Sequence, residues 1–215
     1  MLQNAMLREL WLQWQRRKWR ARATHPLLQR LLVDPLPDGH FNERRYVVAD
    51  LETTSLSAAE GEIASIGWVA VEQGRVLLES ARHFHIAVRD EVGQSAVFHQ
   101  LTDTDLKQGV ELQVALGHFL GAIRGSTLVF HNAQLDMAFL NDAVQALWGA
   151  PLLVPVEDTM QWQLQRLSRQ MEVIPDGALR LFQCRARYGL PDAPAHDALG
   201  DAIATAELWL AINAE

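Results

Sequence analysis

The chain has 215 residues, of which 49% are hydrophobic and 21% are charged. This composition excludes an intrinsically disordered chain and allows one well-packed domain with an appendage. The formal charge of −7 is unevenly distributed: residues 1–30 hold seven Lys/Arg and one acid, whereas residues 31–215 hold twelve Lys/Arg and twenty-five Asp/Glu. The acidic main part, at a net charge of −13, is a poor match for wrapping a long polyanion.

Cysteine usage and hydropathy bear on the compartment. Cys184 is the only thiol, which leaves no disulfide framework and no cysteine-rich zinc site and suits a reducing cytoplasm. The apolar stretches are interrupted well before a membrane-spanning length, and the N-terminal sequence lacks the apolar core and cleavage site of a secretory signal. We therefore expect a cytoplasmic protein that does not enter a membrane.

Residues 1–40 are expected to form a basic helical extension and a linker. An amphipathic helix is predicted by an apolar stripe at helical spacing, made of Leu7, Leu10, Trp11 and Trp14. Pro26 is expected to open a second short helix through Leu32, and the prolines and glycine of "VDPLPDGHFNE" indicate a linker. The stripe favours a docking face for the domain, a second copy or a protein partner. A nucleic-acid surface with stacking tryptophans is the alternative.

From Arg45 onward the pattern predicts an α/β domain over residues 41–215. Three strands are expected in "RYVVADL", "IASIGWVAVEQ" and "RVLLESARHFHI", with a hairpin at Gly74. Helical spacing follows in "ELQVALGHFLGAI", then a strand in "STLVF" and a helix in "AQLDMAFLNDAVQALW". Further helices are expected near 158–169, 176–188 and 197–212. Strands first, and then alternating strands and helices, indicate a mixed sheet flanked by helices.

The stretch "VVADLETTSL" places Asp50 and Glu52 at the end of an apolar strand with one residue between them. Side chains at i and i+2 of a strand share a face, so two carboxylates there repel each other unless a cation lies between them. This pair is the first indication of a metal site.

Two later stretches supply further acids on rigid elements. Asn132 is expected to cap a helix that carries Asp136 in its first turns. Asp201 lies among small residues that allow a helix to approach a sheet closely, and His196 stands just before that helix. These two acids and the imidazole are expected to meet the pair on the first strand.

Four carboxylates without cysteine form a hard oxygen donor set, which suits Mg²⁺ or Mn²⁺ better than zinc. Two such ions about 3.5 to 4 Å apart clamp a phosphodiester in many nucleases. His196 would serve as general base, because an imidazole titrates near neutral pH.

The motifs "DLETT" (50–54), "HNAQLD" (131–136) and "HDALGD" (196–201) resemble, in order and spacing, the three motifs of the DnaQ-like, or DEDDh, 3'-5' exonucleases. "EIASIGWVAV", "FHQLTDTDL" and "EDTMQ" also resemble that family. The resemblance implies a ribonuclease-H-like fold with a five-stranded mixed sheet. It also implies two divalent ions, Mg²⁺ or Mn²⁺, held by the four carboxylates Asp50, Glu52, Asp136 and Asp201.

The same resemblance implies roles for the remaining residues. His196 would be the base of the histidine subclass, and Thr53, His99 and Asn132 would meet the terminal nucleotide. Two departures, Leu135 in place of a common Phe and "HQLT" in place of "HGIT", concern substrate fit and touch none of the expected metal ligands.

Three functional hypotheses follow from the sequence. The first is a 3'-5' exonuclease that acts on single-stranded or frayed DNA ends and releases nucleoside 5'-monophosphates. The second is an RNA-trimming exoribonuclease of the same family, because no residue identifies contacts to the 2'-OH. The third is a proofreading-type subunit that works mainly through a protein complex, with the N-terminal helix as its docking element.

Overall fold

The computed structural model describes residues 2–87, 109–193 and 197–214, with side chains from residue 7 onward. In chain order its elements are α1 (Leu2–Arg20), α2 (Pro26–Leu31), the 3-10 turn η1 (Phe41–Glu43), β1 (Arg45–Thr53), β2 (Ile63–Glu72), β3 (Arg75–His85), α4 (Leu112–Ala122), β4 (Ser126–Phe130), α5 (Ala133–Trp148), β5 (Val156–Asp158), α6 (Thr159–Ser168), α7 (Leu181–Ala186) and α8 (Ala198–Asn213). In this described part, no helix combines the length and apolarity needed to cross a membrane.

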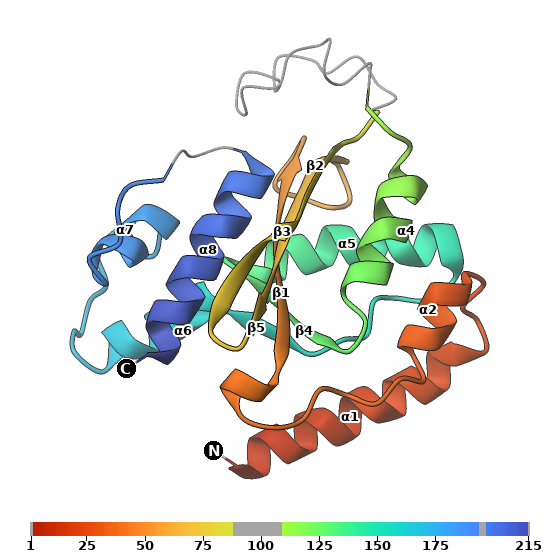
Figure 1. The fold of residues 1–215 in the computed structure, drawn as a ribbon, viewed down its shortest axis with the longest axis horizontal. Coiled ribbons are helices and arrows are strands. Elements are labelled where there is room, and N and C mark those ends of the chain that lie inside the picture. Colours follow the sequence, from red (N-terminus) through yellow and green to blue (C-terminus); the bar gives the residue numbers. More distant parts are fainter. Residues whose placement is uncertain (1, 88–108, 194–196, 215) are drawn as a thin grey trace.

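A five-stranded mixed sheet with the order β3-β2-β1-β4-β5 forms the centre of the fold (Figure 1). β1, β2 and β3 form an antiparallel meander, and β4 and β5 run parallel to β1. α4 and α5 cover one face of the sheet, and α8 covers the other. This arrangement confirms the expected α/β class with a mixed sheet.

Alternating side chains of β1 serve the two faces of the sheet. Val47 and Ala49 join the core under α4 and α5, whereas Tyr46 and Val48 join the core under α8. Because side chains on a strand alternate between the two faces, Asp50 and Glu52 also point toward α8. The sheet therefore aims the first pair of acids at the helix that carries the last one.

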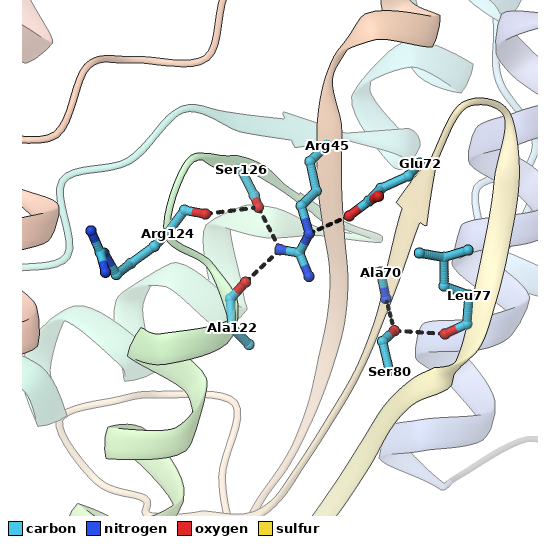
Figure 2. Close-up of polar contacts among 8 residues, drawn as sticks. All are labelled: Arg45, Ala70, Glu72, Leu77, Ser80, Ala122, Arg124 and Ser126. Atoms are coloured by element: carbon cyan, nitrogen blue, oxygen red, sulfur yellow. Dashed lines mark hydrogen bonds and ion pairs between the residues drawn. The ribbon is translucent and has the colours of Figure 1, made fainter.

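Arg45 ties the start of β1 to its neighbours on both sides (Figure 2). Its guanidinium donates to the carbonyl oxygen of Ala122 at 2.5 Å and to the Ser126 hydroxyl at 2.7 Å, so it holds the turn between α4 and β4. The same guanidinium pairs with Glu72 at 2.6 Å, at the end of β2. This end of the sheet is thus fixed by polar contacts.

A β-bulge interrupts the pairing of β2 with β3 between Trp68 and Ala70. The Ser80 hydroxyl fills the irregularity, since it accepts a hydrogen bond from the Ala70 amide at 2.8 Å and donates to the Leu77 carbonyl at 2.6 Å (Figure 2). A bulge increases the local twist of a strand pair. The side chain therefore satisfies the backbone groups that the bulge would leave unpaired.

The N-terminal helix lies below the edge of the sheet where β1 begins (Figure 1). Arg16 is only 6% exposed, and Trp19 packs against the main core. The apolar stripe predicted as a docking face points away from the domain: its four members, Leu7, Leu10, Trp11 and Trp14, are each more than half exposed. The prediction that this stripe packs on the domain is therefore wrong, whereas binding to a protein partner, a second copy or a nucleic acid stays a prediction.

Candidate active site

Three carboxylates converge where β1 ends and α8 begins. Asp50 and Glu52 project from β1, and Asp201 comes from the first turn of α8. Each offers one oxygen to a group in which all ligand atoms lie within 4.8 Å of one another. This donor set suits a hard divalent cation.

A glycine on β2 allows this close approach. Gly67 lies directly opposite Asp50 in the antiparallel pairing and faces α8. A Cβ atom at this position would overlap the backbone of Ala198 and Leu199. The first turn of α8 therefore touches the sheet directly, and Asp201 reaches the β1 acids from there.

Asp197 shapes the start of α8. It is the N-cap residue, and its carboxylate accepts a hydrogen bond from the Gly200 amide at 2.8 Å. The other carboxylate oxygen lies 3.3 Å from Nδ1 of His83 on β3. The N-terminus of α8 is thus anchored to the strand beyond β2 as well.

Asp136 is held next to β1 from the opposite face of the sheet. It is 5% exposed in the first turn of α5, and its Oδ1 accepts a hydrogen bond from the Leu51 amide at 3.2 Å. Leu51 is the residue between the two β1 acids. Asp136 lies outside the group of three carboxylates with mutual distances below 4.8 Å, but its charge acts on Asp50.

The start of α5 differs from its expected capping. Asn132 occupies the N-cap position with φ of 82°, in the left-handed region, and its side chain makes no capping hydrogen bond. The carboxylate of Asp158 accepts instead from the amides of Asn132 at 3.1 Å and Ala133 at 3.0 Å. The same carboxylate caps α6. The side-chain cap predicted for Asn132 is therefore wrong, because an acid 26 residues later supplies the acceptor.

Burial, together with neighbouring negative charges, raises the pKa values of Asp50, Glu52 and Asp136. Burial, followed by the charges of Asp201 and Asp197, raises the pKa of Glu52 to about 7. Burial also raises the pKa of Asp136 to about 8, although its backbone hydrogen bonds oppose this. The pKa of Asp50 lies well above its ordinary value, first through burial and then through Asp136. Packing like charges in a dry site therefore costs folding free energy.

The remaining predicted residues fall in different places. Thr53 ends β1, and its hydroxyl donates to the Ser55 carbonyl at 2.7 Å. Asn132 lines an open surface groove of about 570 Å³ together with Pro175. His99 and His196 lie outside the described residues.

Two histidines that the sequence patterns did not single out border the site. The ring of His131 bridges the hydroxyl of Thr159 and the carbonyl of Leu179, both at 2.8 Å, so it joins β4 to the segment before α7. Burial is the main cause that lowers the pKa of His83, and Asp197 opposes it. His131 opens the quoted motif "HNAQLD" but contributes structure there, and His83 had no motif to identify it.

The mixed sheet and its two helical layers agree with the ribonuclease-H-like fold expected from the motifs, and the acidic cluster lies at the end of β1. An exonuclease family model, RNase_T, matches residues 47–209, which is well over half of the chain. The chain therefore belongs to this exonuclease family.

The curated relatives include PolC-type DNA polymerase III proteins. The PolC-type DNA polymerase III of Thermotoga petrophila is 28% identical over 176 residues, which cover 80% of this chain and 12% of that protein. The corresponding protein of Halalkalibacterium halodurans is 33% identical over 129 residues, or 59% of this chain and 8% of that protein. The chain thus spans only a small part of the relatives that it matches.

Solved structures share the fold at low identity. Cell-death related nuclease 4 (CRN-4) aligns with a TM-score of 0.66 and 12% identity, over 80% of this chain and 64% of that one. E. coli exonuclease I in complex with a dT13 oligonucleotide aligns with a TM-score of 0.62 and 14% identity, over 80% of this chain and 41% of that one.

The raised pKa values predict that the metal-free protein loses stability as the pH rises. The folded state keeps protons on Glu52 and Asp136 that the unfolded state releases near pH 4 to 4.5. This stabilising contribution is complete below that pH and is lost as the pH rises through about 7 and 8. A bound divalent cation offsets the repulsion between the carboxylates that have lost their protons at high pH. Mn²⁺ should therefore raise the melting temperature more at pH 8.5 than at pH 6.

Thermal unfolding in EDTA and in MnCl₂ across this pH range measures the effect. A melting temperature in EDTA that does not fall between pH 6 and pH 8.5, or an equal Mn²⁺ effect at both pH values, would contradict the electrostatic account of the cluster.

Proposed function

We propose that this protein is a metal-dependent 3'-5' exonuclease that releases nucleoside 5'-monophosphates from single-stranded or frayed DNA ends. The observation that carries the proposal is the convergence of Asp50, Glu52 and Asp201 within 4.8 Å, with Asp136 hydrogen-bonded to the strand between them. The catalytic domain in this proposal comprises residues 41–215, and residues 1–40 form an extension.

The donor chemistry fits two divalent ions, Mg²⁺ or Mn²⁺. The candidate ligands, Asp50, Glu52, Asp136 and Asp201, offer only oxygen atoms. Burial without a cation raises the pKa values of Asp50, Glu52 and Asp136. When bound, such ions supply Lewis-acid stabilisation of a phosphodiester and lower the pKa of water. Asp201 reaches them from α8, and Asp136 from α5.

The other roles rest on the motif positions. His196 precedes the N-cap of α8, and we assign its imidazole to accept the proton of the attacking water. Thr53, His99 and Asn132 are assigned to contact the terminal nucleotide. The groove beside Asn132 has a volume in the range of ligand sites, which supports the assignment of Asn132 to nucleotide binding.

DNA is the proposed substrate because the curated relatives are DNA polymerases by name and one structural neighbour was solved with a dT13 oligonucleotide. An exoribonuclease of the same family is the alternative. A site that handles a terminal nucleotide needs few phosphate contacts, which agrees with the acidic main part of the chain.

Digestion of a 20-nucleotide DNA strand labelled at its 5' end, with Mg²⁺ or Mn²⁺, tests the direction of cleavage. A 3'-5' exonuclease gives a ladder of shortened labelled strands, and a blocked 3' end suppresses the ladder. Immediate release of the label as a mononucleotide, or cutting that ignores the 3' block, would sink the proposed direction.

The same digestion with an RNA strand of matched sequence separates the two substrates. Faster cleavage of DNA is expected, and equal or faster cleavage of RNA would favour the exoribonuclease.

A further inference from the structure

A basic groove lies between the two N-terminal helices, far from the carboxylates. Arg17 and Arg20 of α1 line it together with Arg30 of α2, and its volume is about 700 Å³. Within the described residues, no carboxylate forms an ion pair with any of these three arginines. Guanidinium groups bind phosphates well, and three of them without ion-pair partners give this groove a cationic surface.

Exposed aromatic side chains lie on the turns of α1 that precede the groove residues Arg17 and Arg20. Trp11 and Trp14 are each 57% exposed, on the side of the helix that faces away from the domain. Arg17 follows Trp14 by three residues, so the two are neighbours on the helix surface. Lys18 places its ammonium 5.5 Å from the centroid of the Trp14 ring. Flat apolar rings thus alternate with cations along the same surface.

Charge complementarity indicates the occupant. The first 30 residues carry seven Lys/Arg and one acid, whereas the rest of the chain has a net charge of −13. A cationic groove beside exposed aromatic rings is the arrangement by which proteins hold single strands, with phosphates in the groove and bases on the rings. The two exposed tryptophans offer such rings.

We propose that α1 and α2 form a second binding site, for the single strand upstream of the 3' end. The phosphates lie against Arg17, Arg20 and Arg30, and the bases stack on Trp11 and Trp14. The inference rests on the proposed function in one respect: the strand held at α1 is the one whose 3' end reaches the carboxylates.

The position of the site sets the length of strand that can use it. α1 lies at the edge of the sheet where β1 begins, whereas the carboxylates lie where β1 ends (Figure 1). Seven residues of strand between Arg45 and Glu52 span about 23 Å. A trinucleotide is shorter than this length of β1 even when it is extended, whereas a 20-mer is much longer than it. The site at α1 therefore acts only on longer strands.

Binding of a fluorescent dT20 strand tests the proposal directly. The measurement uses the full chain carrying Asp50→Asn, in EDTA, so that no cleavage occurs. Replacing Arg17 and Arg20 with Gln is expected to weaken binding at low salt about tenfold and to reduce the salt-dependence slope by about 1.4, since each lost phosphate contact removes about 0.7. The matched control replaces Arg75 and Arg169, two exposed arginines outside the groove, and is expected to bind as before.

The tryptophans have their own conservative control. Trp11→Ala with Trp14→Ala is expected to weaken dT20 binding about tenfold or more. Trp11→Phe with Trp14→Phe keeps an aromatic face and should retain most of the affinity. Equal losses in the Ala and Phe variants would overturn the stacking role. If the groove substitutions leave the affinity for dT20 unchanged, the proposed site is overturned. This conclusion holds even if the α1 variants change the association between copies of the chain.

Cleavage rates separate this inference from the proposed function. In an otherwise unmodified chain, the groove variants should cleave a trinucleotide at the wild-type rate and lose the advantage of the 20-mer. A wild-type chain that cleaves neither strand contradicts the proposed exonuclease, while the dT20 binding result still decides the site at α1.

Discussion

Replacing Asp50 with Asn and Glu52 with Gln is expected to lower nuclease activity by at least about 10³-fold while making the metal-free protein more stable at pH 8. The activity falls because two of the four proposed cation ligands lose their charge, and metal ions contribute several kcal/mol to transition-state stabilisation. The stability rises because the substitutions remove buried like charges; burial, followed by the charges of Asp201 and Asp197, raises the pKa of Glu52 to about 7.

Opposite changes in two measurements make this prediction specific. Oligonucleotide digestion gives the activity, and thermal unfolding in EDTA gives the stability. The exposed pair Glu79→Gln and Glu172→Gln is a control that should change neither, since both side chains are exposed and neither residue is a candidate ligand. A variant that loses both activity and stability would indicate that the acids support the fold. It would contradict the claim that these acids provide activity at the expense of folding stability.

Substituting Gly67 with Ala is expected to produce the second-largest effect. The added Cβ would overlap the backbone of Ala198 and Leu199, so α8 must move away from β2. Overpacking of this kind costs about 1 to 3 kcal/mol, or a melting temperature lower by several degrees. A displacement of Asp201 by about 1 Å also lowers activity, by about 10²-fold.

Gly117 provides the matched control for this glycine. It lies in α4, and a Cβ there would meet nothing within 4 Å. Gly117→Ala should leave activity unchanged and raise stability by up to about 1 kcal/mol, because alanine favours helix. Wild-type activity and stability in Gly67→Ala would show that α8 does not need its close contact with β2.

Periodicity was sufficient to predict the long elements. The β1 to β3 meander, the hairpin at Gly74 and α8 agree with the expected segments to within a few residues. Each of these elements buries one face or both faces, so the spacing of its hydrophobic residues indicates its type and extent. The sharing of one face by Asp50 and Glu52 follows from the same period of two.

The elements that sequence reasoning missed depend on distant contacts. β5 has only three residues, Val156–Asp158, and forms through its pairing with β4. α7 begins at Leu181, later than expected, since Gly177 has a φ of 75° that no helix accommodates. The capping of α5 by Asp158 joins positions 26 residues apart. The pairing of β5 and the capping of α5 have no local pattern that could reveal them.

Part of the candidate site was likewise invisible in the sequence. The acids could be proposed from three short motifs, but the close approach of α8 depends on Gly67, which no motif marks. Gly67 becomes meaningful only through its pairing with Asp50 across the sheet. The stripe on α1 was recognised as amphipathic, yet its direction depends on how Arg16 and Trp19 pack.

Calorimetric titration of Mn²⁺ into the full chain tests the central claim, that the four carboxylates form a cage for divalent cations. Two Mn²⁺ ions per chain are expected to bind at pH 8 in the presence of a nucleoside 5'-monophosphate, with proton release on binding. This binding is expected to be lost in the variant with Asp50→Asn and Glu52→Gln. Absence of binding in the wild type, or equal binding in the variant, would contradict the four-carboxylate site.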